Sequence, residues 1–156
     1  MHAAGFLITA LLAAVITVSA GLQFGQICSG NPTNSIRGWD LKGAGHFGAP
    51  RRSKTHKGVD VVCADGSTVY APADLTITRR SRPYGNNVAI DNGILFTAGG
   101  VCFKLWYIEP VKISGTVQKG QRLGTMLNMQ SVYPGITSHV HVERCDKADP
   151  TAIVSI

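Results

Sequence analysis

Short runs of β-forming residues, separated by glycine, asparagine and proline, extend along most of the chain after residue 20. The runs are GVDVV, STVYA, LTITRR, NNVAI, GILFT, VCFKLWYI and SHVHVE, with turns expected at AGG (98–100) and QKGQ (118–121). No sustained 3.6-residue periodicity appears there, so helix should be minor and confined mainly to NPTNSIRG, near the start. The pattern predicts a mainly β protein, a single antiparallel β domain with a short helical N-terminal segment.

The first 20 residues differ from the rest of the chain. They form an apolar run without Lys, Arg, Asp or Glu, and Val18, Ser19 and Ala20 supply the small residues of a signal-peptidase site. The run is short for a membrane span, which needs roughly 20 apolar residues, so no membrane insertion is expected. We therefore expect residues 1–20 to be a signal peptide and residues 21–156 to be one secreted, extracellular domain.

Four cysteines, Cys28, Cys63, Cys102 and Cys145, are spread along the predicted mature chain. An even number in an exported protein favours disulfides, and the spacing alone leaves three pairings open. A four-cysteine zinc site is the weaker alternative, because the sequence contains no CxxC pair.

The chain is basic, with a net charge of +6 and a pI near 9.4. Positive residues gather in RRSKTHK (51–57) and RRSR (79–82). Either cluster suits a sulfated glycosaminoglycan, an anionic cell wall or an acidic receptor surface, whereas the simplest interpretation is a solvated surface. No nucleic-acid-binding motif accompanies the charge, so no nucleic acid partner is expected.

The segment SHVHVE places two histidines in a predicted strand. Side chains alternate along a strand, so His139, His141 and Glu143 share one face and the valines share the other. One interpretation is a half-buried strand whose polar face carries histidine. The other is a site that uses both imidazoles.

A second polar motif, HKGVD, places His56 and Asp60 four residues apart. In a straight strand their Cα atoms would be roughly 13 Å apart, near the limit that two side chains can span around one ion. Gly58 lies between them and predicts a bend. Together with the histidines of SHVHVE, these residues form a set that can converge on a metal, and three protein ligands with an open position are typical of catalytic zinc.

The ordered motifs HKGVD, GSTVYAPADL, YGNNVAI, VQKGQRLG and SHVHVE resemble the lysostaphin-type (LytM) zinc metallopeptidase domain, whose pattern is HxxxD followed much later by HxH. The resemblance covers essentially all of residues 21–156. It implies a β domain of the duplicated hybrid motif kind, with zinc held by His56, Asp60 and His141. It also implies that His139 occupies the position of a catalytic histidine.

The resemblance is stronger to secreted vertebrate members of this fold, and it implies two disulfides, Cys28 to Cys63 and Cys102 to Cys145. A third, short-loop disulfide of those members is missing, because Trp39 and Ala44 occupy its positions. Both partners are replaced together, so no unpaired thiol is expected.

The chain departs from the active bacterial members at one further position. Those enzymes carry a histidine in a YxHL-like strand, and the matching stretch here is YIEP, with Glu109 in the place of the histidine. An ionised glutamate cannot donate a hydrogen bond, although it can act as a base. The substitution predicts little or no peptidase turnover, and the simplest interpretation of Glu109 is an exposed carboxylate at a strand end.

Three functions remain as hypotheses. The resemblance implies a cytokine-like protein that attracts leukocytes such as neutrophils through a receptor on leukocytes or other cells. The second is a secreted zinc endopeptidase that acts on glycine-rich or peptidoglycan peptides, or a protein that binds such peptides without cleaving them. The third is a basic module that binds glycosaminoglycans.

Overall fold

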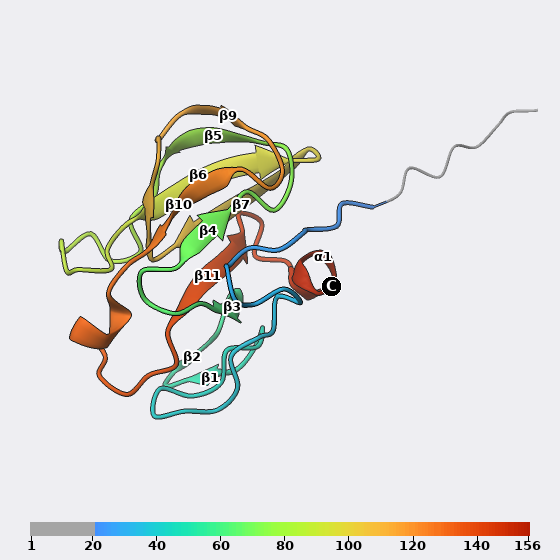
Figure 1. Cartoon of the computed structure of the whole chain (residues 1–156). Coiled ribbons are helices and arrows are strands. Elements are labelled where there is room, and N and C mark those ends of the chain that lie inside the picture. The colour runs from blue at the N-terminus through green and yellow to red at the C-terminus, as the bar shows by residue number, and fades with distance from the viewer. Residues whose placement is uncertain (1–20) are drawn as a thin grey trace, which may run out of the picture.

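The computed structural model describes residues 21–156, so the predicted signal peptide lies outside the described residues. These residues form eleven strands, one short α-helix and one 3-10 helix (Figure 1). The bounds are β1 (Pro50–Arg51), β2 (Lys54–Thr55), β3 (Val59–Val62), β4 (Thr68–Tyr70), β5 (Leu75–Arg80), β6 (Gly93–Ala98), β7 (Val101–Trp106), β8 (Ile108–Pro110), β9 (Gly115–Val117), β10 (Arg122–Met126), β11 (His139–Arg144), η1 (Met129–Ser131) and α1 (Thr151–Val154). The prediction of a mainly β, antiparallel protein is confirmed.

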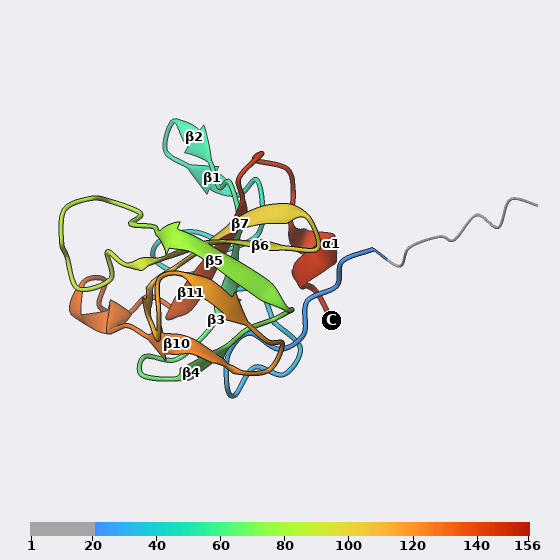
Figure 2. The same ribbon diagram turned by 90° about the horizontal axis from the view of Figure 1, so that it is seen from above.

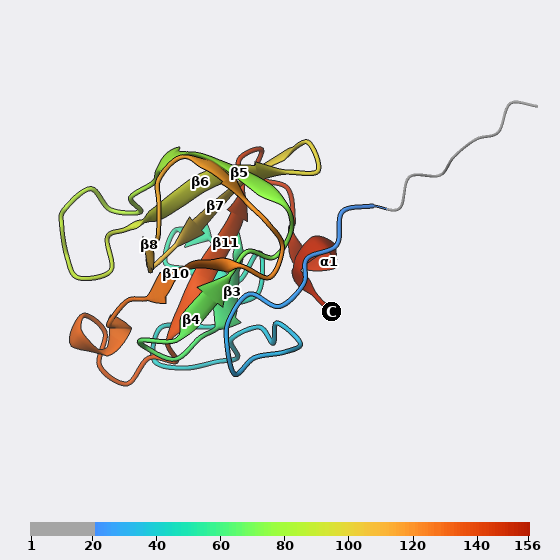
Figure 3. The ribbon, with the colours of Figure 1, turned by 45° about the horizontal axis from the view of Figure 1, so that its top comes forward.

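The strands form two sheets and a separate hairpin. The larger sheet has the order β3-β11-β7-β6-β5-β9, and the smaller one the order β4-β10-β8, with every pair antiparallel. Figures 1 and 3 show β4 and β10 against one face of the larger sheet, and Figure 2 shows the β1–β2 hairpin projecting from the body. No helix in residues 21–156 is long and apolar enough to cross a membrane.

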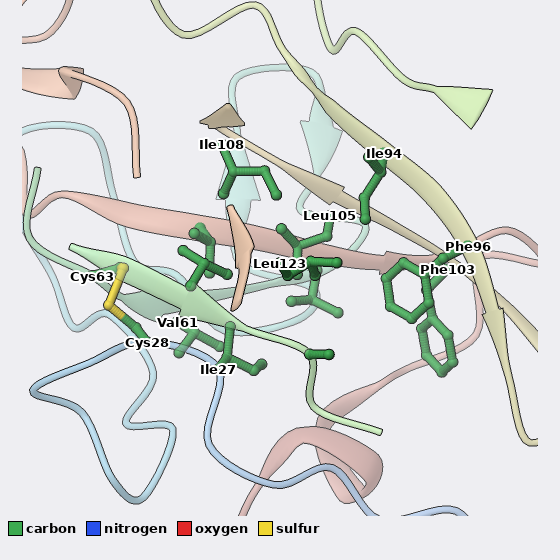
Figure 4. Close-up of a cluster of buried hydrophobic side chains, with 14 of the residues drawn as sticks. Ile27, Cys28, Val61, Cys63, Ile94, Phe96, Phe103, Leu105, Ile108 and Leu123 are labelled. Carbon is green, nitrogen blue, oxygen red and sulfur yellow. A yellow bond between two sulfur atoms is a disulfide. The ribbon is translucent and has the colours of Figure 1, made fainter. Parts of the chain in front are cut away.

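The hydrophobic core fills the space between the two sheets (Figure 4). Val61, Leu105 and Phe103 of the larger sheet are fully buried, as are Ile108 and Leu123 of the smaller one. On β11 the alternation predicted for SHVHVE is observed, since its two valines belong to the core. On the opposite face His141 contacts Asp60 and Glu143, and His139 lies near the same Asp60. The polar residues of β11 are therefore placed on a second surface of the sheet.

The prediction of a helix at NPTNSIRG is wrong, because this segment forms turns. The side chain of Asn34 accepts a hydrogen bond from the Ile27 amide (2.9 Å) and donates to the Gly25 carbonyl (2.9 Å). Asn31 accepts in the same way from the Ser35 amide (2.8 Å). The Asn31 side chain thus satisfies a backbone amide that a helix would otherwise pair, a competition that disfavours helix, while Asn34 holds the segment against residues 25 and 27.

The prediction of a strand at NNVAI is also wrong, because residues 86–90 lie in the loop between β5 and β6. The carboxylate of Asp91 accepts hydrogen bonds from four consecutive backbone amides, those of residues 84–87. These hydrogen bonds curl the backbone around Asp91 and leave it unavailable for a strand ladder.

Both predicted disulfides are present. They join Cys28 to Cys63 and Cys102 to Cys145, with Cα–Cα distances of 5.6 and 5.4 Å, and leave no free cysteine in the described residues. Near the substituted position Trp39, backbone hydrogen bonds between Asp40 and Gly43 close the short loop (3.1 and 3.3 Å).

Removal of the Cys28–Cys63 disulfide is expected to destabilise the fold. This bridge ties the N-terminal segment to the end of β3 across a sequence separation of 35. The double variant Cys28→Ala/Cys63→Ala should lose about 2 to 4 kcal/mol of unfolding free energy, because the unfolded chain regains the freedom that the bridge removed. Urea denaturation monitored by fluorescence measures the loss, and an unchanged midpoint would contradict the expectation.

Candidate metal centre

Three predicted ligands meet on the polar face of the larger sheet. Asp60 of β3 and His141 of β11 are directly paired across the two strands, and His56 lies in the segment that leads into β3. The distance from Asp60 Oδ1 is 3.1 Å to His56 Nε2 and 3.0 Å to His141 Nδ1, and the two nitrogens are 3.1 Å apart. The three side chains could therefore hold one metal ion.

Gly58 makes this convergence possible. The chain bends there, as predicted, and the reason is close packing. A Cβ atom at Gly58 would lie 2.3 Å from the Val142 carbonyl oxygen and 2.8 Å from two atoms of the His141 ring. Only glycine allows the segment that carries His56 to approach β11 this closely.

The outer ring nitrogen of each histidine has its own partner. His56 Nδ1 donates to the His46 carbonyl oxygen (2.9 Å), so Nε2 presents its lone pair to the centre. His141 Nε2 donates to Glu143 (3.1 Å), which orients the ring with Nδ1 inward. Tetrahedral zinc separates its nitrogen and oxygen ligands by about 3.4 Å, so the observed donor spacing fits zinc after a small expansion.

The charges at the centre also suit a cation. Burial opposes ionisation of Asp60, yet the hydrogen bond with His141 holds the pKa of this carboxyl well below its usual range. Burial lowers the pKa of His141, but hydrogen bonds to Asp60 and Glu143 outweigh it and raise that pKa. The hydrogen bond to Asp60 (3.0 Å) favours a proton on the inner nitrogen of His141 in the metal-free protein, and a bound cation would take the place of that proton.

Arg37 is a residue that the sequence analysis missed. Its side chain is buried, and its Nη2 and Nε atoms donate to Asp60 Oδ2 at 3.0 and 3.3 Å. This pairing fixes the carboxylate so that Oδ1 faces the imidazoles. Gly45 makes room for it, because a Cβ there would lie 2.7 Å from the Arg37 Cβ and 2.8 Å from the Asp60 Cβ. No sequence pattern singled out Arg37, which lies in the segment predicted to be helical.

The comparison with known families agrees with the donor set. Residues 54–152, which contain all three candidate ligands, match Peptidase family M23. The chain belongs to peptidase family M23.

Two named proteins are similar in sequence to this chain over most of its length. It is 49% identical to leukocyte cell-derived chemotaxin-2 of Bos taurus, over 92% of this chain and 95% of that protein. It is 53% identical to myeloid protein 1 of Gallus gallus, over 81% of this chain but only 40% of that protein. The two disulfides and the similarity to a chemotaxin are consistent with an extracellular protein.

Among solved structures, Helicobacter pylori Csd3 shares the fold. The TM-score is 0.50 at 16% sequence identity, over 78% of this chain and 31% of that one. At this identity the likeness supports the lysostaphin-type β architecture and nothing about activity.

The predicted catalytic candidate His139 lies beside the M23 donor set. Its Nδ1 donates to the Thr137 carbonyl oxygen (2.7 Å), and its Nε2 lies 3.5 Å from Asp60 Oδ2. Burial lowers the pKa of His139, which keeps the ring neutral with the Nε2 lone pair directed toward the site. His139 is therefore suited to accept a proton.

Glu109, which the family resemblance places at the position of a second histidine, is not among the residues that line the cavity of this M23 site. It is exposed on β8 and accepts a hydrogen bond from the Asn92 side chain (2.6 Å). The interpretation of Glu109 as an exposed carboxylate in a strand fits this placement. Among residues 21–156, the histidines that line the cavity are His56, His139 and His141.

The M23 site opens into a cavity of about 320 Å³. Three tyrosines that the sequence analysis missed, Tyr84, Tyr107 and Tyr133, form part of its wall. The hydroxyl groups of Tyr84 and Tyr107 are 3.0 Å apart, and burial raises the pKa of Tyr107 to about 12. Figures 1 and 3 show the loops before β6 and before β11, which carry Tyr84 and Tyr133, projecting from the same side of the molecule. These loops frame a binding space above the donor set.

Proposed function

We propose that this chain is a secreted, zinc-binding, cytokine-like protein that attracts leukocytes, neutrophils among them, through a cell-surface receptor. It keeps the M23 site with little or no peptide turnover. The observation that carries the proposal is the convergence of all three candidate ligands, combined with a cavity lining that does not include Glu109. Two of the similar proteins, from Bos taurus and Mus musculus, are named leukocyte cell-derived chemotaxin-2, and this name supports the signalling role.

The residues around the donor set support zinc as the cofactor. Two imidazole nitrogens and a carboxylate oxygen are ligands that zinc binds in proteins. In a tetrahedral site these three ligands leave one coordination position open. Zinc bound there would supply a Lewis acid and a cross-link between β3 and β11. Glu143 and the His46 carbonyl group orient the two imidazoles, as the outer-shell partners of metal-bound histidines do.

A second candidate function is the cleavage of glycine-rich or peptidoglycan peptides, or their binding without cleavage. The position of His139 favours it, because its Nε2 atom can take a proton inside the cavity. Tyr107 also lines the cavity and keeps its proton at neutral pH, so it can donate a hydrogen bond. The missing second imidazole opposes efficient turnover, since it removes one of the two donors or bases that active members use.

Two assays on the same protein preparation separate these functions. We expect the zinc-loaded protein to attract neutrophils in a migration chamber and to leave pentaglycine intact. His139→Ala should preserve migration, because this residue is not one of the proposed ligands. Robust cleavage of pentaglycine by the unmodified protein, lost in His139→Ala, would refute the proposal of a signal without turnover. Absence of migration with full zinc content would refute the signalling role itself.

A further inference from the structure

A second hollow lies beside the metal cavity, between the loop at residues 41–43 and the β1–β2 hairpin. Its volume is about 580 Å³. Four of its eight lining residues are cationic and none is acidic; the lining is Leu41, Lys42, Gly43, Pro50, Arg51, Arg52, Ser53 and Lys54. We call this hollow the hairpin groove. Its charge makes it a site for an anionic ligand.

The β1–β2 hairpin carries these charges at a cost to its own stability. Arg52 has φ of +45°, a left-handed conformation that glycine or asparagine adopts with less strain. Arg51 and Lys54 are directly opposite each other in the hairpin, and like charges in that arrangement repel. A hairpin selected only for folding would not combine these two features, so the cations point to a role in binding.

The cations of the groove are incompletely neutralised within the described chain. In residues 21–156, neither Arg52 nor Lys54 forms an ion pair or a side-chain hydrogen bond. Arg51 lies 3.7 Å from Asp60, whose carboxylate already pairs with Arg37, and Lys42 lies over the ring of Tyr133. A negatively charged ligand would therefore find several donors without a competing carboxylate.

Apolar side chains accompany the charge. Leu41 lines the groove and is 79% exposed, and Trp39, two residues earlier, is 73% exposed. Exposed tryptophan and arginine are enriched at the centres of protein interfaces, and Leu41 adds an apolar contact within the groove. A sulfated sugar offers only the C–H groups of its rings and no aliphatic or aromatic side chain to these residues, and a flat bilayer does not fill a concave groove. A polypeptide supplies both carboxylates and apolar side chains.

We propose that the hairpin groove binds an acidic segment of a protein partner, in which carboxylates contact Arg52 and Lys54 and an apolar side chain covers Leu41. This inference goes beyond the proposed function, because the binding does not depend on zinc or on leukocyte migration. The groove shares Lys42 and Arg51 with the metal cavity, so the partner segment would lie directly beside the metal centre.

The test uses residues 21–156 with both disulfides formed and a fluorescein-labelled peptide in which pairs of glutamates flank single leucines. Fluorescence anisotropy should show binding that weakens as salt is added. Arg52→Gly should weaken binding about three- to fivefold, the scale of one lost charge contact. The same variant should unfold at an equal or higher temperature, because glycine relieves the left-handed strain. Lys112→Gln, which removes one charge from an exposed site outside the groove, should bind as the unmodified protein does.

Three further probes distinguish the alternatives. A peptide with serine in place of leucine should bind more weakly, and Leu41→Ser should abolish that difference. Heparin oligosaccharide and phosphatidylserine vesicles serve as the other anionic probes. If Arg52→Gly weakens heparin or vesicle binding but not peptide binding, the proposed partner class is wrong. Equal weakening of peptide binding by Arg52→Gly and Lys112→Gln would show that net charge alone attracts the peptide, and would overturn the proposal of a groove.

Discussion

The variant His141→Ala should lose stoichiometric zinc and the thermal stabilisation that zinc provides. His141 lies on β11 opposite Asp60 of β3. Its loss leaves only His56 and Asp60 as ligands, and β11 then contributes none of the three proposed ligands. A ligand that binds only the folded state stabilises it by about 2.7 kcal/mol when its free concentration is a hundred times its Kd. The unmodified protein should therefore melt higher in zinc than in chelator, and His141→Ala should melt alike in both.

The matched control is His46→Ala. His46 is exposed, and it contributes to the centre through its backbone carbonyl group, which alanine keeps. This variant should retain both the zinc content and the difference in melting temperature. Metal content by mass spectrometry, measured beside the melting curves, makes the comparison direct. Full zinc occupancy in His141→Ala would refute the assignment of this residue as a ligand.

The variant Arg37→Met should destabilise the fold even without metal. Methionine keeps much of the arginine volume but removes both hydrogen-bond donors to Asp60 Oδ2. The buried carboxylate then keeps only the histidines and the more distant Arg51 (3.7 Å) as partners. Removal of one partner from a buried ion pair usually costs about 3 to 5 kcal/mol. Guanidinium denaturation in chelator should show a loss of this size, and metal affinity should also fall as Asp60 loses its orientation.

An exposed pair of the same chemistry provides the control for Arg37. Arg144 donates two hydrogen bonds to Asp146, at 3.0 and 2.7 Å, near the end of β11. Solvent screens this pair, so Arg144→Met should change the denaturation midpoint little. If both variants lose the same amount of unfolding free energy, burial of the Arg37–Asp60 pair does not account for its contribution to stability.

Much of the fold followed from local patterns. Strict alternation in SHVHVE predicted β11, and the valine-rich and threonine-rich runs predicted β3, β5 and β6. Errors arose where a single side chain organises distant backbone, as Asn34 and Asp91 do. VCFKLWYI was predicted as one strand, but a left-handed Tyr107 (φ +78°) divides it between β7 and β8. Such a break depends on contacts that no local propensity reports.

For the candidate site, the sequence motifs showed that histidines and an aspartate could converge on a metal. The family resemblance implied which three of these residues would be the ligands. His56, Asp60 and His141 converge because β3 and β11 pair in one particular register, which spacing in the sequence does not specify. Arg37 and Tyr84 were missed because each lies in a loop without periodic pattern. Their roles come from tertiary contacts, of Arg37 with the Asp60 carboxylate and of Tyr84 with Tyr107.

The position of β11 in the larger sheet has a consequence for biosynthesis. This strand is the last in the chain, yet it lies between β3 and β7 rather than at an edge. A nascent chain that has emerged only as far as β10 therefore presents an unfilled slot between two strands, with His56 and Asp60 beside it but no third donor. Insertion of β11 closes the sheet and completes the donor set in one event, so metal capture should coincide with the insertion of this strand.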